Sequence, residues 1–310
     1  MTEQPHAANG RGNGLSEQEA SARAWSDLSI EQVPSIWQEA VRRFFANPLA
    51  VSGLIIASLI VLCAILADVL SPYPRDVANF SEVLRRPSET HLLGTDGIGR
   101  DFLTRVLHGA RTSMVVGFSV PLLSTLIGVP LGAYAGWRRG GFDFVLLRVI
   151  EILTALPGIL VAILLITVWG AGIEKLILFM TVTAWAGIAR FARAQFMQYK
   201  EREYVTSARA LGATSWRMMV HHILPNAAGP LIVSMMTAVP GAIFSEAGLS
   251  FLGLGINDPV PSWGKMVADS QQYLSTYWHL AVVPTVLIAL TMLAFTFVGD
   301  GLRDAFDPYM

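Results

Sequence analysis

Long stretches of hydrophobic residues without charged side chains recur along this chain of 310 residues. A helix needs about 20 such residues to cross a lipid bilayer, and the pattern predicts six spans. The fourth is short, and it spans only if Lys175 and Arg190 extend toward the two surfaces. The expected spans are Leu49–Ala67, Thr112–Trp137, a third that enters near Phe144 and ends at Ile173, Leu176–Ala189, Pro225–Ser245 and Leu280–Gly299. We therefore expect an all-α integral membrane protein with its transmembrane domain over residues 49–300.

Proline and glycine interrupt these hydrophobic stretches. Five prolines should kink their helices and free backbone carbonyl groups for neighbouring helices. They are Pro121, Pro130, Pro157, Pro240 and Pro284. Gly128, Gly132 and Gly136 recur at four-residue spacing, which permits another helix to approach closely. Helix packing is therefore their expected role.

The segments outside the spans differ in character. Residues 1–33 contain few large hydrophobic side chains and predict a disordered tail. Residues 34–48 place hydrophobic side chains near one helical face, which fits either an interfacial helix on the membrane or an ordinary extension of the first span. Residues 68–111 form the expected outer loop, 190–225 the inner loop and 301–310 a short tail. Within the outer loop, Phe102–His108 predicts a helix that packs on the membrane surface.

Lysine and arginine favour one orientation. With the N-terminus inside, fourteen of the 22 basic residues lie on the inner side and eight on the outer side. Cytoplasmic loops of membrane proteins carry such an excess. Both termini are therefore expected in the cytoplasm.

Composition narrows the function. Hydrophobic residues make up 53% and charged residues 15% of the chain, against about 25% charged in soluble proteins. The formal net charge of −1 gives no basic surface for nucleic acid. Cys63 is the one cysteine, which excludes a disulfide framework. No phosphate-loop motif occurs. We expect no catalytic residue, cofactor or metal on this chain.

Two carboxylates lie within or beside spans, where ionised groups are costly and often functional. Arg148 precedes Glu151 by three residues, so these two can form an ion pair on one helix face. Glu246 has no such neighbour in the sequence. It is expected either to face an aqueous pathway or to pair with another chain.

The inner loop carries two short helical patterns, Tyr204–Leu211 and Ser215–Leu224, around Gly212. Such an element can present its exposed face to a partner subunit or rest on lipid headgroups. The residues expected to make contact are Glu203, Ala208, Arg209, Ala210, Leu211, Gly212, Ala213, Arg217 and Pro225.

This loop resembles the EAA loop of bacterial ABC importer permeases. Glu203-Tyr-Val-Thr-Ser-Ala-Arg-Ala-Leu-Gly212 is followed by His222-Ile-Leu-Pro-Asn226. Thr206-Ser207-Ala208 stands where the motif has Glu-Ala-Ala, so the motif's glutamate is missing here. Gly212, Leu224 and Pro225 keep their places.

Further segments are similar to the second permease subunit of dipeptide, oligopeptide and nickel importers. They are Arg42–Pro48, Leu93–Asp101 with Gly94, Asp96, Arg100 and Asp101, Gly109–Ser113, Leu249–Gly255, Pro261–Gly264 and Gly299–Pro308. The resemblance implies a six-span type I importer fold in the inner membrane of a bacterium, which pairs with a related permease subunit. It also implies two ABC ATPase subunits that hold ATP and magnesium, an extracytoplasmic binding protein and a peptide substrate.

Other functions remain open at this point. Relatives of this kind also carry nickel chelates or glutathione. A gradient-driven secondary transporter with Glu246 as a proton relay belongs to another class, as does a membrane scaffold without transport.

Overall fold

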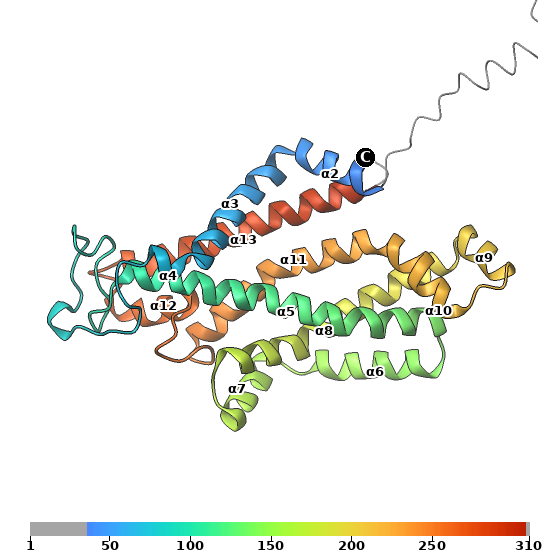
Figure 1. The fold of residues 1–310 in the computed structure, drawn as a ribbon. Coiled ribbons are helices and arrows are strands. Elements are labelled where there is room, and N and C mark those ends of the chain that lie inside the picture. Colours follow the sequence, from blue (N-terminus) through green and yellow to red (C-terminus); the bar gives the residue numbers. More distant parts are fainter. Residues whose placement is uncertain (1–35, 308–310) are drawn as a thin grey trace, which may run out of the picture. The chain divides into compact units, whose positions relative to one another are not determined.

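The computed structural model describes residues 36–307, all of it helices and loops without a β-strand in that range. The expected tail of residues 1–33 lies outside the described residues. Helix α2 (Ile36–Ala46) precedes α3 (Pro48–Ile65), α4 (Ala67–Leu70), the 3-10 turn η1 (Phe80–Glu82), α5 (Phe102–Arg138), α6 (Gly141–Ala155), α7 (Gly158–Trp169) and α8 (Ile173–Lys200). The chain continues with α9 (Glu203–Ala210), α10 (Ser215–Arg217), the π-helix η2 (Met218–Ile223), α11 (Leu224–Phe251), α12 (Trp263–Ser270), η3 (Gln271–Tyr273) and α13 (His279–Phe306). The compact unit from residue 40 onward is described below, and Figure 1 labels its helices.

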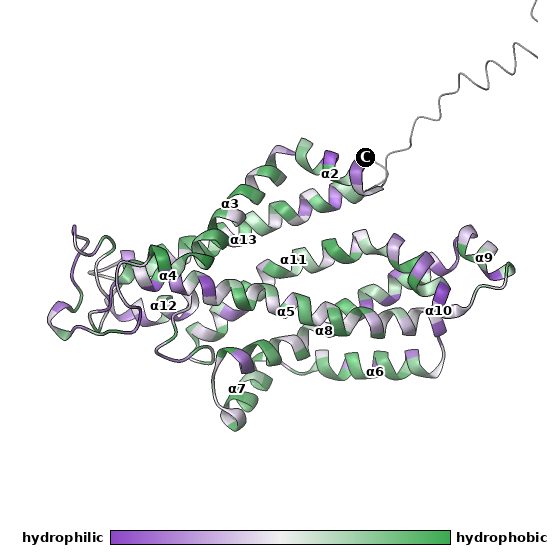
Figure 2. Ribbon diagram, viewed as in Figure 1, coloured by the Kyte–Doolittle hydropathy of each residue, from purple (hydrophilic) through white to green (hydrophobic). Residues whose placement is uncertain are grey.

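Among residues 36–307, five helices are long and apolar enough to cross a bilayer, and the bent pair α6–α7 makes a sixth if it counts as one span. The five are α3, α5, α8, the continuous α10–α11 stretch and α13. Figure 2 shows hydrophobic residues along these helices and hydrophilic ones in the loops at the two ends of the bundle. The expectation of an all-helical membrane bundle with six spans is confirmed in this form.

Several helices are longer than the hydrophobic stretches from which their spans were predicted. Helix α5 begins at Phe102, so Phe102–His108 is the buried first part of a span and not a separate surface helix. Helix α8 continues through Arg190 to Lys200, so the loop expected from residue 190 begins after it. Helix α13 ends at Phe306, within the expected tail. The hydrophobic stretches were ended at charged residues, but the helices continue through these residues.

The third expected span is broken. Helices α6 and α7 meet at Pro157 with a bend of 85°. Proline lacks the amide hydrogen and disfavours a helical residue before it, and Leu156 accordingly takes an extended conformation. The kink expected at Pro157 is therefore confirmed, and it breaks the span expected over Phe144–Ile173 into two helices.

Helices α5 and α8 pack against each other along much of their length and run parallel. A Cβ on Gly128 would lie 2.8 Å from the carbonyl oxygen of Trp185, and one on Gly136 would lie 2.5 Å from that of Arg193. A Cβ on Gly132 would overlap the carbonyl group of Ala189. The expected close packing along this glycine stripe is confirmed.

A second pair joins the first span to the last. Asn47 caps α3 by accepting hydrogen bonds from the backbone amides of Leu49 and Ala50, and Pro48 occupies the first turn. The Asn47 side-chain amide also donates to Asp304 on α13 at 3.3 Å. On α2, Ala40 and Phe44 are buried against α3 and α13. One face of α2 therefore packs on protein, and both expectations for residues 34–48 stay predictions.

Candidate functional site

The loop between α8 and α11 is a helix–turn–helix element at one end of the bundle, here called the α9 end (Figure 1). Helix α9 ends at Ala210, and Gly212 takes a φ of +81°. The amide of Gly212 donates to the carbonyl of Arg209, and that of Ala213 donates to the carbonyl of Ala208. This left-handed turn favours glycine because other residues are strained at a positive φ. Lack of space is not the reason, since an added Cβ at Gly212 would meet no atom within 4 Å.

The base of this element is fixed in the protein interior. Val205 on α9 is fully buried, and Ile223 at the end of η2 is as well. Both belong to a hydrophobic cluster with Phe196 of α8 and Trp137 of α5. The short helix is thus attached to the ends of two spans.

The tip of the element is exposed and apolar. Leu211 is 89% exposed and Trp216 is 71% exposed. Ala210 is also exposed, whereas Ala208 and Ala213 are only half-exposed and Ala213 packs against the cluster. The exposed apolar contact surface is therefore formed by Ala210 and Leu211, with Trp216 in addition. Trp216 was missed because it lies outside the recognised motif, although a tryptophan in a polar loop is itself a signal.

Basic residues gather beneath this tip. The Arg209 guanidinium lies 5.4 Å from the centre of the Trp137 ring, and the Lys200 ammonium lies 5.1 Å from it. Lys200 also donates to the Trp137 carbonyl at 2.5 Å. Arg209 therefore has a cation–π contact inside the chain. Glu203 opens α9, Arg217 closes α10, and Pro225 lies exposed in the first turn of α11.

The opposite end, here called the α12 end, is built on the segment that precedes α5. Asp101 caps α5 by accepting from the amide of Thr104 at 2.8 Å, and its other oxygen lies 2.8 Å from His91 Nδ1. Asp96 accepts from the amides of Ile98 and Arg100. Gly94 allows the turn before this segment with a φ of +77°. The four expected residues of this segment thus shape a turn and a helix cap.

An ion-pair network joins this segment to the loop before α12. Arg100 donates to Asp96 at 2.7 Å and to Asp258 at 3.1 Å. Asp258 also lies 3.1 Å from the Lys265 ammonium. Burial acts to raise the pKa of Asp258, but hydrogen bonds from Lys265 and Arg100 outweigh it and leave that pKa below its usual value. At neutral pH Asp258 is therefore a carboxylate that ties two loops together.

Glu246 is fully buried at the contact of three helices. Its carboxyl group accepts from Ser250 at 2.8 Å and from Ser113 of α5 at 3.1 Å. The expectation that Glu246 faces an aqueous pathway or pairs with another chain is wrong for this structure. Ser113 was not considered because 133 residues separate it from Glu246.

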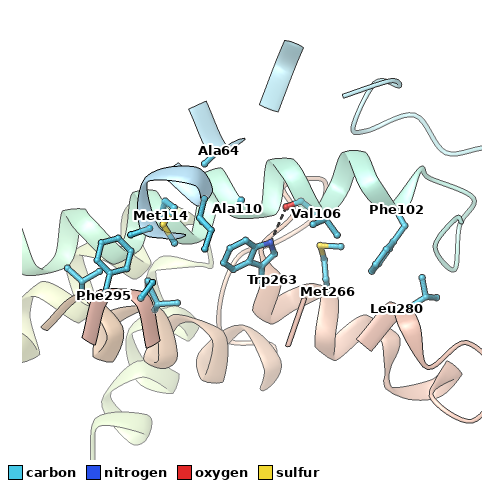
Figure 3. Close-up of a cluster of buried hydrophobic side chains, with 14 residues drawn as sticks. Ala64, Phe102, Val106, Ala110, Met114, Trp263, Met266, Leu280 and Phe295 are labelled. Atoms are coloured by element: carbon cyan, nitrogen blue, oxygen red, sulfur yellow. Dashed lines mark hydrogen bonds between the residues drawn. The ribbon is translucent and has the colours of Figure 1, made fainter. Parts of the chain in front are cut away.

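Trp263 lies next to this contact, and Figure 3 shows its hydrogen bond to Val106 within the hydrophobic cluster. Its indole Nε1 donates to the Val106 carbonyl at 3.0 Å, and its amide lies 3.4 Å from Ser113 Oγ. Its ring lies in a hydrophobic cluster with Met114 and Met266. Helix α12 is therefore held between α5 and α11.

Arg148 and Glu151 form the expected ion pair at 2.6 Å on α6, with both side chains more than half exposed. Such a surface pair contributes little to stability.

The bent α6–α7 pair leaves an apolar groove of about 610 Å³ beside α5, α8 and α11. Pro121, Phe179, Gly241 and Phe244 are among its lining residues. Helix α7 is almost entirely exposed, since Ala162 is its one buried residue. This face of the chain is an apolar surface.

No group of three or more metal-ligating side chains occurs among residues 36–307. The expectation of no cofactor on this chain stays a prediction. The site residues described above hold helices together or present a surface, and none of them forms a nucleophile–base pair.

Several known proteins are similar to this chain in sequence, and a solved structure is similar in fold. Residues 128–310 match the family described as "Binding-protein-dependent transport system inner membrane component", and residues 35–87 match the "N-terminal TM domain of oligopeptide transport permease C". The oligopeptide transport system permease protein OppC of Bacillus subtilis is 44% identical over 88% of this chain and 90% of its own length. The dipeptide permease DppC of the same organism is 43% identical over 88% and 86%. The glutathione permease GsiD of Pectobacterium atrosepticum is 36% identical over 90% and 93%.

A solved structure of the MetNI methionine ABC transporter in an inward-facing conformation has a chain with the same fold. Its TM-score is 0.51 at 18% identity, over 65% of this chain and 96% of that chain. The gradient-driven transporter and the scaffold find no support among these matches. The chain belongs to the family of binding-protein-dependent transport system inner membrane components, and it is a membrane-spanning permease subunit of an ABC importer.

Proposed function

We propose that this subunit forms half of a pathway for peptides and couples it to ATP hydrolysis on separate subunits. Two ABC ATPase subunits would bind and hydrolyse ATP with magnesium. An extracytoplasmic binding protein would deliver the substrate. The relatives named for oligopeptides, dipeptides and glutathione support a substrate with peptide bonds. Nickel chelates are the second candidate substrate.

The other half of the pathway would come from a related six-span subunit. The apolar groove and the exposed helix α7 support this, because their area is large and uncharged. Exposed apolar surfaces of this size are covered by lipid or protein. Part of this face would contact the second permease, and the rest would contact the bilayer.

We place the α9 end of the bundle in the cytoplasm, with both termini on that side. The excess of lysine and arginine at this end supports the orientation. The α12 end would then face the extracytoplasmic binding protein. A cysteine at Asp96 should react with an impermeant thiol reagent from outside.

The observation that carries the coupling role is the exposed apolar tip on a fixed base. A motion of the ATPase can reach the spans only if the element that contacts the ATPase is held rigidly to the ends of those spans. Leu211 supplies an exposed contact, while Val205 and Ile223 bind the same element to the ends of α5 and α8. The turn at Gly212 sets the angle between α9 and α10.

Two substitutions test this role in the assembled importer. Leu211→Ser should leave the amount of the subunit in the membrane unchanged, because the side chain is 89% exposed. It should lower peptide uptake and the ATPase stimulation by loaded binding protein. Gly212→Val should do the same more strongly, since a β-branched residue is strained at a φ of +81°.

The matched control is Val69→Ser, which changes a 79% exposed side chain at the other end of the bundle. It should leave uptake and stimulation at the original level. Full stimulation in both loop variants would show that this element does not couple the subunits. Uptake of a labelled panel of peptides, glutathione and nickel chelates in a strain without the chain identifies the substrate.

A further inference from the structure

A polar cavity of about 230 Å³ lies at the α12 end, between the start of α5 and helices α12 and η3. Its apolar side is formed by Phe102, Met266 and Leu280, which Figure 3 shows at one end of the hydrophobic cluster. Its polar side includes Arg105 and Gln272. The cavity is separate from the exposed tip at the α9 end and from the apolar groove.

Arg105 is the unusual residue of this cavity. Its side chain is 2% exposed, and neither of its terminal nitrogens has a hydrogen-bond partner within the described chain. A buried donor without an acceptor is costly, and a charged one is more so. The guanidinium therefore requires an acceptor from outside the described chain.

The nearby carboxylates do not meet this need, because their oxygens lie beyond hydrogen-bond distance of both terminal nitrogens. Arg105 lies 3.4 Å from Asp96 and 3.9 Å from Asp258, and Arg100 donates to the same two oxygens at 2.7 and 3.1 Å. The second oxygen of Asp258 faces Lys265, which also pairs with Asp269. The carboxylates Asp96, Asp258 and Asp269 line the cavity with Arg100 and Arg105, yet both terminal nitrogens of Arg105 keep no acceptor among the described residues.

We propose that this cavity binds a carboxylate group, which accepts from the free terminal nitrogens of Arg105. The planar fork of arginine suits a carboxylate, which can accept two parallel hydrogen bonds. The volume of the cavity holds a small carboxylate or the end of a short peptide. The group can come from a free solute or from the C-terminus of a peptide, and the peptide source rests on the proposed function.

Binding to the purified full chain in lipid nanodiscs tests this without ATP, ATPase or uptake. Calorimetry with sodium acetate should show saturable binding, while acetamide and sodium chloride at equal ionic strength should show none. Dialanine should bind if peptides are a source, and its C-terminal amide should not. If hydration alone satisfies Arg105, acetate and acetamide behave alike, and the proposal is overturned.

Charge changes at the rim locate the site without disturbing the buried arginine. Gln272 is exposed and lines the cavity, whereas its exposed neighbour Gln271 does not. Gln272→Glu should weaken acetate binding about fivefold and Gln272→Lys should strengthen it by a similar factor, as expected for one charge near a protein surface. The same changes at Gln271 should have a smaller effect. Equal effects at both positions would place the ion elsewhere and overturn the proposal.

Failure of this test is distinguishable from failure of the proposed function. A chain that binds no acetate but supports peptide uptake refutes the cavity alone. A chain that binds acetate in the nanodisc but supports no peptide uptake refutes the substrate alone.

Discussion

Arg193 on α8 and Asp143 on α6 form a two-pronged ion pair across 50 residues of sequence. One guanidinium nitrogen donates to Asp143 Oδ2 at 2.6 Å, and Nε donates to Oδ1. Both side chains are mostly buried. This pair connects the first turn of α6 to the C-terminal third of α8, the long helix that leads to α9.

Removing one partner should destabilise that connection. Asp143→Asn leaves Arg193 without its charged partner in a mostly buried place, so we expect a loss of about 1–2 kcal/mol. Thermal unfolding of the purified subunit measures this. The exposed pair Arg148–Glu151 offers the control, and Glu151→Gln should change the midpoint little. Equal effects of the two changes would contradict a structural role for Arg193.

The glycine stripe yields a second prediction. Gly132→Ala places a methyl group against the Ala189 carbonyl of α8, and overpacking of this kind costs about 1–3 kcal/mol. The amount of folded subunit in the membrane should fall. Gly187→Ala on α8 is the matched control, because a Cβ there meets no atom within 4 Å. It should leave the amount unchanged or raise it.

The third prediction is that Glu246 acts through its hydrogen-bond acceptors and not through its negative charge. Glu246→Gln keeps one oxygen acceptor for Ser113 and Ser250, and the serine hydroxyl groups can rotate to accept from the new amide. We expect near-normal stability and uptake. Glu246→Ala removes the acceptor and leaves a cavity at the contact of α5, α11 and α12, so a loss of about 2–4 kcal/mol is expected. Lost uptake with normal stability in the Gln variant would instead show that the charge itself acts in transport.

A fourth prediction concerns pH. The pKa of Asp258 is below its usual value in the folded state, through its hydrogen bonds from Lys265 and Arg100. Its contribution to stability is present above the usual carboxyl pKa and is lost as the pH falls through the lowered one. The thermal midpoint of the original protein should exceed that of Asp258→Asn at pH 7. The difference should shrink below about pH 4, and a difference that grows there would contradict this ion-pair role.

Hydropathy alone located the six apolar stretches, because each must present about 20 uncharged residues. It could not give the helix ends. Arg105 and His108 are buried in the first turns of α5, yet their charge and polarity excluded them from the expected span. A sequence window contains no information on which distant groups surround such a side chain.

The site was predictable where the signal is local. Gly212 follows a helical pattern and adopts the left-handed turn that glycine favours. Arg148 lies three residues before Glu151, and the pair forms. Glu246 could not be assigned, since its partner Ser113 lies on another helix. Arg105 was missed because its feature is the lack of an acceptor, which only a folded arrangement reveals.

Helix α5 runs without interruption from the Arg105 cavity to Trp137 beneath the α9 tip. Its 37 residues make a rod of about 56 Å at 1.5 Å per residue. A tilt of about 5° about one end would carry the other end through about 5 Å, by the geometry of a rod of that length. A displacement imposed at the α9 end would therefore reach the α12 end mechanically, as in a lever. Pro121 and Pro130 are the points where this lever would bend under load.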